Sequence, residues 1–237
     1  MSSAAGLVIA SPASGCGKTT ATLALLRAFR ARGVRVASAK VGPDYIDPAF
    51  HAAASGRSCC NLDPWAMRHE LLAGLIEESG RDAELLLVEG VMGLFDGAAD
   101  GSGSSADLAA LAGWPVVLVV DAAGQGASIA ALVKGFRDFR AEVEVAGVIA
   151  NRTAGKRHRA ILEAALARVG TPLLGCLPRD PALSLPDRHL GLVQAREHPA
   201  LEAFLRLAGA RAAEHVDLAA LLRLARPSRL AEAAERA

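Results

Sequence analysis

The sequence has few aromatic residues and almost no excess charge, and each scarcity excludes a class of protein. Aromatic residues make up 4% of the 237 positions, with one tyrosine and two tryptophans. The 26 basic and 25 acidic residues leave a formal net charge of +1. Such a balance provides no basic field over the whole chain that would attract nucleic acid or an anionic membrane. We therefore expect neither as a partner.

Cysteine and long apolar runs are also scarce. The four cysteines lack the paired spacing of a zinc site, and the adjacent Cys59 and Cys60 are poorly placed to bridge each other. No apolar run approaches the roughly 20 residues of a membrane span. The first residues show no basic segment before an apolar run, as a secretory signal would. We expect reduced thiols and a cytoplasmic location.

Short apolar runs alternate with helix-length segments along most of the chain. The runs lack in/out alternation, which is typical of strands buried on both faces of a parallel sheet. They cover residues 7–10, 34–37, 85–88, 116–120, 145–149 and 172–177, and helical segments include 19–32 and 125–140. This pattern predicts an α/β fold, a P-loop NTPase-like parallel sheet with helices on both faces. Its ligand site should lie beyond the carboxyl ends of the strands.

The alternation stops after residue 177. A proline-containing loop over 178–188 is followed by helical stretches near 196–213 and 217–225. Residues 227–237 read as a linker or tail. We therefore predict one domain over residues 1–226.

A phosphate-binding loop is predicted directly after the first apolar run. Gly15 and Gly17 let backbone N–H groups face phosphate oxygens, Lys18 neutralises the β/γ charge, and the Thr19 hydroxyl can ligate Mg²⁺. Pro12 stands where the general pattern has glycine, and an ordinary glycine-rich turn is the alternative. Placement between a strand and a helix favours the nucleotide. The predicted nucleotide-binding residues of this loop are Ser14, Gly15, Cys16, Gly17, Lys18, Thr19 and Thr20.

A lysine and two carboxylates follow the second apolar run, in residues 40–48. Lys40 can stabilise charge on a transferring phosphoryl group or bind a substrate carboxylate, while Asp44 and Asp47 can orient substrate or metal. His51 follows one turn later. Taken alone, the segment could also be a Gly-Pro turn with solvated charges.

Further acidic and amide side chains follow other runs. Glu89 ends a strand, where a P-loop protein usually holds Mg²⁺, and an unpaired buried glutamate would be costly. Asp96 lies in a glycine-flanked loop. Asp63 is another candidate Mg²⁺ ligand, although an Asx turn or helix cap explains it nearly as well. Asn151 either reads the adenine edge or is a turn residue.

Four of these segments together resemble the cobyrinic or hydrogenobyrinic acid a,c-diamide synthase family, in its synthetase half. They are residues 14–20, 40–48, 89–97 and 188–192. The runs Lys-x-Gly-Pro-Asp-Tyr-x-Asp-Pro and Glu-Gly-Val-Met-Gly-Leu-Phe-Asp-Gly separate this family from its relatives, and the similarity covers nearly the whole chain. It implies an ATP- and Mg²⁺-dependent ligase of cobalamin biosynthesis. Such enzymes amidate the a and c acetate side chains of a corrinoid through an acyl phosphate.

The resemblance also implies roles for individual residues. Glu89 is the principal Mg²⁺ carboxylate, and Lys40 bridges the γ-phosphate and the substrate carboxylate. The wider fold family includes dethiobiotin synthetase, whose Asn-x-Asp run resembles residues 61–63, so Asp63 becomes a second metal ligand. The phosphates and metal are held by Gly15, Gly17, Lys18 and Thr19. The pocket for the reacting side chain is lined by Asp44, Tyr45 and Asp47, with Asp96 nearby.

The family normally continues into a glutaminase domain with a catalytic cysteine and histidine. No cysteine of this chain has a nucleophile-elbow context, so we expect a glutaminase, on a longer chain or a separate protein, to supply ammonia. Cobyric acid synthase and dethiobiotin synthetase are alternatives that residues 42–48 argue against. A partitioning ATPase is another, but Ala13 stands where those proteins resemble one another in carrying an extra lysine. The sequence leaves open the corrinoid's metal, the amidation order and the oligomeric state, a homodimer included.

Overall fold

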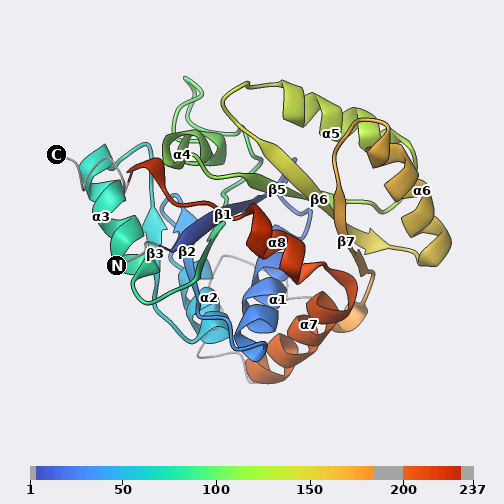
Figure 1. The fold of residues 1–237 in the computed structure, drawn as a ribbon, viewed down its shortest axis with the longest axis horizontal. Coiled ribbons are helices and arrows are strands. Elements are labelled where there is room, and N and C mark those ends of the chain that lie inside the picture. The colour runs from blue at the N-terminus through green and yellow to red at the C-terminus, as the bar shows by residue number, and fades with distance from the viewer. Residues whose placement is uncertain (1–3, 184–199, 231–237) are drawn as a thin grey trace.

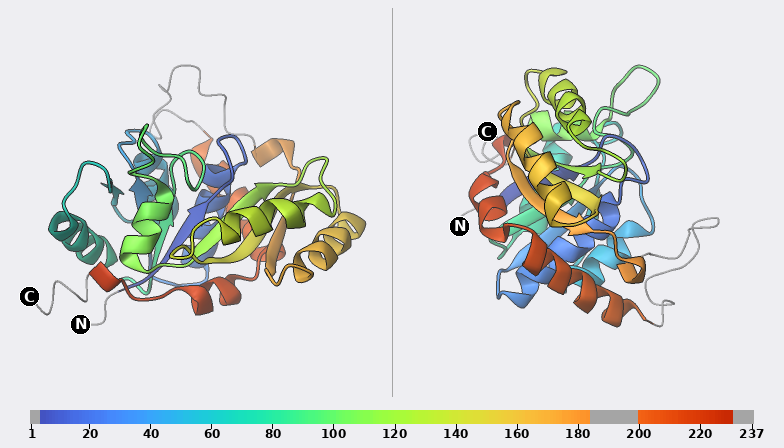
Figure 2. Two further views of the ribbon diagram at one scale, coloured as in Figure 1. Left: turned by 90° about the horizontal axis from the view of Figure 1, so that it is seen from above. Right: turned by 90° about the vertical axis from the view of Figure 1, so that its right-hand side faces the viewer.

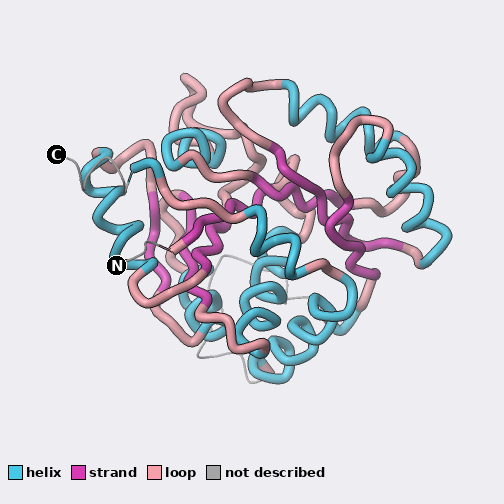
Figure 3. The backbone as a smooth tube through the Cα atoms, viewed as in Figure 1, coloured by secondary structure: helices cyan, strands magenta, loops and turns pink. Residues whose placement is uncertain are grey.

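A seven-stranded parallel sheet forms the centre of the domain, in a computed structural model that describes residues 4–183 and 200–230. The strands are β1 (Ala5–Ala10), β2 (Val36–Val41), β3 (Cys59–Leu62), β4 (Leu85–Glu89), β5 (Val116–Asp121), β6 (Val145–Thr153) and β7 (Leu173–Pro178). Their spatial order is β3-β2-β4-β1-β5-β6-β7, and they form a continuous band between the helices (Figure 3). The predicted α/β parallel sheet is confirmed.

Helices cover both faces of this sheet (Figure 1). One face carries α1 (Lys18–Ala31), α2 (Asp47–Ser55), α7 (Leu201–His215) and α8 (Leu218–Leu224), and the other carries α3 (His69–Gly80), α4 (Ser105–Ala112), α5 (Ser128–Asp138) and α6 (Lys156–Ala167). The further views keep these two helical layers on opposite sides (Figure 2). A short 3₁₀ turn, η1 (Pro181–Leu183), follows β7. Among the described residues, no helix is long and apolar enough to span a membrane.

Each face of the sheet has its own apolar core. Leu7 and Ile9 of β1 point into the core shared with α1 and α7, whereas Val8 points into the core under α4. This follows from the two-residue period of a strand, and it explains why the run is apolar throughout. Trp114 packs closely against β1, since a Cβ at Gly6 would lie 2.1 Å from its ring.

Strand β3 was not among the predicted apolar runs. It is four residues long, lies at the sheet's edge, and three of its residues are only partly buried. A short, half-exposed edge strand needs no apolar run, so its sequence gives no strand signal.

The end of the chain returns to the sheet. Val216 forms an antiparallel bridge with Gly175 of β7, and Arg226 forms one with Gly6 of β1. Ser228 is buried and Leu230 packs against the core. The beginning of the predicted tail therefore lies against the domain, and residues 231–237 fall outside the described part. The motif at 188–192 also falls outside it.

Sheet order brings the predicted motifs to one edge. The loop after β1 lies centrally, because β1 pairs with β4 on one side and β5 on the other. Lys40 of β2 pairs in register with Glu89 of β4. Because all strands are parallel, their carboxyl ends share this edge, where the site is built.

Candidate active site

The loop between β1 and α1 has the geometry of a phosphate cradle. Gly15 and Gly17 have φ angles of 82° and 87°, a region in which side chains are strained. The start of α1 has no side-chain cap and no acidic residue in its first turn. Its first N–H groups and its dipole are thus available to an anion.

A buried ionic network lies beneath this loop. Glu89 Oε1 accepts hydrogen bonds from Thr19 Oγ1 at 2.6 Å and from Lys40 Nζ at 2.9 Å. Glu89 Oε2 lies 2.6 Å from Nε2 of His51. Lys40 Nζ also lies 2.8 Å from Asp47 Oδ2. Glu89, Lys40, Asp47 and His51 are at most 3% exposed, so the network is sheltered from solvent.

These contacts determine which side chains of the network are charged. Burial would raise the pKa of Glu89, but Lys40, His51 and Lys18 outweigh it and hold that pKa well below its usual value. Burial would lower the pKa of Lys40, yet Glu89 and Asp47 raise it above its usual value. Burial opposes the charge of His51 too, while its contacts with Cys59 and Glu89 raise its pKa to about 9. At neutral pH Glu89 therefore carries a negative charge, and Lys40 and His51 carry positive charges.

Lys18 lies at the mouth of the same site. Its Nζ donates to the carbonyl oxygen of Met92 at 3.2 Å. Burial lowers its pKa, and the nearby Lys40 adds to that effect while Glu89 opposes it. Met92 itself has a φ of 47°, unusual for a residue with a side chain. No sequence pattern had singled out Met92.

A cavity of about 590 Å³ joins the phosphate loop to the lysine and carboxylate motif. Its lining includes Ser14, Gly15, Gly17, Lys18, Thr19, Thr20, Lys40, Asp44, Asp47 and Met92. The structure therefore brings together residues that the sequence placed in three separate motifs. Transfer of a group between a nucleotide and a second substrate requires that both bind in one shared cavity such as this.

Asp44 and Tyr45 form a defined turn at the end of β2. Asp44 Oδ1 accepts the N–H groups of Ile46 and Asp47 at 2.8 and 2.9 Å. Burial would raise the pKa of Asp44, but these bonds and Lys40 lower it. Tyr45 is 94% exposed and points away from the protein interior. Its role in a side-chain pocket stays a prediction.

Two other predicted acids hold backbone groups. Asp63 Oδ1 accepts the N–H groups of Trp65 and Ala66 at 2.9 and 3.2 Å, which is the turn role left open from sequence. Asp96 Oδ2 accepts the Gly93 N–H at 2.9 Å. These bonds fix the loops after β3 and β4. Metal binding by Asp63 and catalysis by Asp96 stay predictions.

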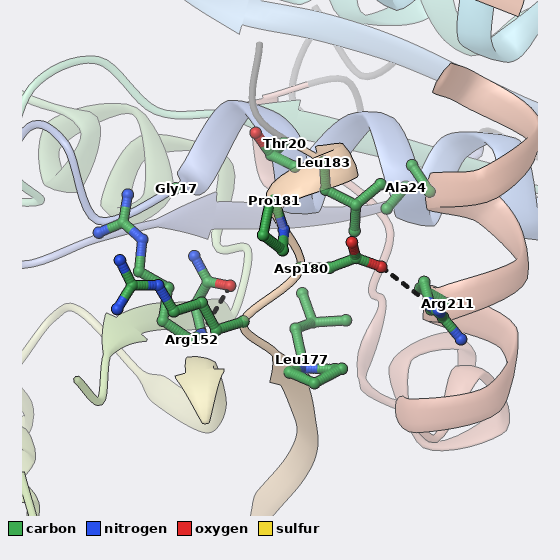
Figure 4. A pocket seen from close by; sticks show the side chains of 13 residues that line it. Gly17, Thr20, Ala24, Arg152, Leu177, Asp180, Pro181, Leu183 and Arg211 are labelled. Carbon is green, nitrogen blue, oxygen red and sulfur yellow. Dashed lines mark hydrogen bonds and ion pairs between the residues drawn. The ribbon is translucent and has the colours of Figure 1, made fainter. Parts of the chain in front are cut away.

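Asn151 borders a second cavity, of about 370 Å³, next to the phosphate loop. Its Nδ2 donates to the Cys16 carbonyl oxygen at 2.9 Å, and a side chain at Gly17 would collide with it. Figure 4 shows Arg152 on one side of this cavity and, on the other, Asp180 paired with Arg211 of α7. Polar side chains thus face this space from opposite sides, and apolar residues such as Leu177, Leu183 and Ala208 complete its lining.

His51 is the functional candidate that sequence reasoning noted but did not select. It lies one helical turn after Asp47 on α2, so the two side chains share a face. That face packs against the end of β2, where Lys40 and Glu89 meet them. The four-residue spacing from Asp47 was the available signal.

The sequence matches a family model described as the CobQ/CobB/MinD/ParA nucleotide binding domain over residues 7–193. The chain belongs to this nucleotide-binding family. The model includes the phosphate loop and every strand described above, so membership agrees with the site's geometry.

Several curated relatives share one name. The chain is 62% identical over 219 residues to hydrogenobyrinate a,c-diamide synthase of Brucella ovis, covering 91% of the chain and 50% of the relative. It is 55% identical over 229 residues to the Rhizobium meliloti protein of that name, covering 97% and 53%. The predicted resemblance to diamide synthases is confirmed. The chain spans about half the length of these relatives.

A solved structure shares the fold. Chloroplast FtsY from Physcomitrella patens superposes with a TM-score of 0.54 at 18% identity, covering 76% of this chain and 60% of that one. This likeness supports the P-loop α/β architecture alone.

Proposed function

We propose that this nucleotide-binding domain uses ATP and Mg²⁺ to amidate the a and c acetate side chains of hydrogenobyrinic or cobyrinic acid, a step of cobalamin biosynthesis. The observation that carries the proposal is the contact of the buried Glu89 carboxylate with both Thr19 and Lys40 beneath the phosphate loop. The similarity to hydrogenobyrinate a,c-diamide synthases supports the choice of substrate.

The donor set beneath the loop fits magnesium. Thr19 Oγ1 and Glu89 Oε1 lie 2.6 Å apart, and both are oxygen ligands of the kind Mg²⁺ takes alongside phosphates and water. No cluster of three His, Cys, Asp or Glu ligands exists in the described ranges, 4–183 and 200–230. A cage of protein ligands is not needed, because Mg²⁺ usually keeps several waters. Bound there, it would neutralise phosphate charge.

Amide formation needs an activated carboxylate, because an oxide-like group leaves poorly. A carboxylate oxygen of the substrate attacks the γ-phosphorus of ATP, and the bond to ADP breaks. Ammonia then attacks the acyl carbon, loses a proton, and inorganic phosphate departs with the transferred oxygen. Lys18 and Lys40 supply fixed positive charge for the phosphoryl group and the carboxylate in a sheltered site.

Asp47 and Glu89 keep the Lys40 ammonium charged and in place. Asp44, beside them on the cavity wall, is suited to orient the substrate's side chain. In the proposal, ammonia comes from a glutaminase domain, and the reaction belongs to the cytoplasm. The chain itself should use free ammonia.

The test is an assay of the purified chain with ATP, MgCl₂ and hydrogenobyrinate, once with an ammonium salt and once with glutamine. We expect monoamide and diamide, detected by mass spectrometry, with the ammonium salt alone. Repeating the assay with cobyrinate identifies the preferred corrinoid. ATP hydrolysis without amide from either acid would reject the function, and glutamine hydrolysis would reject the domain assignment.

A further inference from the structure

Three large apolar side chains are exposed at the edge of the sheet that carries the candidate active site, and we call this edge its rim. Tyr45 is 94%, Trp65 67% and Met92 43% exposed. They follow β2, β3 and β4, which are neighbours in the sheet, so all three lie at its carboxyl edge. The chain has one tyrosine and two tryptophans, and two of these three large side chains are exposed here, where they contribute little to the apolar core. Trp114, the other tryptophan, is buried in the core.

The backbone that carries each of these side chains is held in place. The Trp65 N–H bonds to Asp63 Oδ1 at 2.9 Å. Gly103 lies directly against Trp65, since a Cβ there would come within 2.6 Å of the Trp65 Cβ. The Asn61 Nδ2 donates to the Asp44 carbonyl at 2.9 Å, which ties the end of β3 to the turn carrying Tyr45. Hydrogen bonds and close packing therefore hold the backbone beneath Tyr45 and Trp65 in place.

Met92 connects these side chains with the phosphate site. Its left-handed backbone, with φ 47°, is a costly conformation, and its carbonyl accepts the Lys18 ammonium. Met92 and Asp44 also line the cavity that holds Lys18 and Lys40. Met92 thus links this exposed edge of the sheet with the place where a carboxylate would be activated.

The substrate class of the proposed function has the shape that this rim fits. A corrinoid is a broad macrocycle with apolar faces, and its acetate arms extend from the periphery. An arm that reaches Lys40 brings the ring over the rim of the cavity. Aromatic rings and a thioether are the side chains that bind such faces well, with little entropy lost by the aromatics.

We propose that Trp65 and Met92 extend the side-chain pocket predicted for Tyr45 into a surface that binds one face of the macrocycle, while an acetate arm enters the cavity toward Lys40. This rests on the proposed function and adds two residues, from the loops after β3 and β4, to the substrate site predicted from the sequence. Trp65 does not line the cavity of the phosphate loop, so it should determine affinity for the corrinoid and not for the nucleotide.

The test measures binding of hydrogenobyrinate and of ATP by calorimetry to the wild-type chain and to Trp65→Ala, Met92→Ala and Trp65→Phe. We expect the two alanine variants to raise the corrinoid dissociation constant about fivefold to tenfold, with ATP affinity unchanged in Trp65→Ala, and Trp65→Phe to restore most of the loss. Leu222→Ala, which removes an exposed apolar side chain from α8, is the matched control and should bind like wild type.

The outcomes separate the two proposals. Wild-type corrinoid affinity in both alanine variants would overturn the ring-binding surface and leave the proposed function standing. Equal loss of corrinoid and ATP binding in Trp65→Ala would show a structural role and also overturn it. A wild-type chain that binds ATP but neither hydrogenobyrinate nor cobyrinate would overturn both. Thermal unfolding of each variant checks that these exposed substitutions leave the fold intact.

Discussion

Neutralising Glu89 should destabilise the domain in the absence of any ligand. The substitution Glu89→Gln keeps the shape of the side chain and removes the charge that Lys40, Thr19 and His51 contact. Removing one partner of a buried ion pair typically costs 3–5 kcal/mol. In this variant Lys40 keeps its ion pair with Asp47 at 2.8 Å, so we expect a loss of unfolding free energy at the lower end of this range, about 3 kcal/mol.

The free energy of unfolding is measured by urea denaturation in magnesium-free buffer, with circular dichroism as the signal. In a thermal melt of a domain of this size, the same loss of about 3 kcal/mol lowers the melting temperature by roughly 6–12 °C. Glu78→Gln is the control, because its pair with Arg81 is exposed and should contribute about 0–1 kcal/mol. A double-mutant cycle with Lys40→Met should show that the two losses are less than additive.

The reasoning would be refuted if Glu89→Gln lost less than about 1 kcal/mol, or no more than its control. Either result would mean that the buried contacts contribute no more than a surface pair. An unchanged dependence of the unfolding free energy on urea is needed for the comparison, since a changed slope would signal an altered unfolded or native state.

Three further predictions follow from the same site. Lys18→Ala should abolish ATP-dependent amidation while the circular dichroism spectrum stays unchanged; wild-type turnover would contradict the phosphate-loop assignment. The pKa of His51 is raised from 6.5 to about 9, so the protonated side chain should stabilise the fold fully below pH 6.5, and about 3 kcal/mol of this stabilisation should be lost as pH rises through 9. Urea titrations at several pH values should show the decline in unfolding free energy, and His51→Gln should flatten it. Asp44→Asn keeps the acceptor for the turn, so it should alter the ratio of monoamide to diamide more than ATP affinity; an unaltered ratio by mass spectrometry would argue against its substrate role.

Much of the fold was predictable because strands that are buried on both faces of a parallel sheet appear in the sequence as apolar runs. The runs at 7–10 and 116–120, for example, correspond to β1 and β5. Strand β3 was missed for the complementary reason. Its Cys-Cys-Asn-Leu sequence needs no continuous apolar run, because among the described residues this strand lies at an edge of the sheet and pairs with β2 alone.

The site was predictable where a motif follows a strand, since parallel strands carry their ends to one edge. Thr19, Lys40 and Glu89 lie together at this edge, and their roles there stay predictions. The sequence could not show that His51 reaches Glu89, because that contact depends on how α2 packs against the sheet. Nor could it show the left-handed backbone of Met92, which is set by tertiary contacts rather than by residue type.

The central position of β1 has a consequence for synthesis on the ribosome. The strand that leads into the phosphate loop pairs with residues 85–89 on one side and with 116–118 on the other, so its first partner is made about 80 residues later and its second more than a hundred residues later. At 5–20 residues per second, the apolar segment waits roughly 4–16 s for its first partner strand. A nascent chain exposing that segment is vulnerable to aggregation, so a newly made domain should depend on chaperones during this interval and gain the ability to bind nucleotide late.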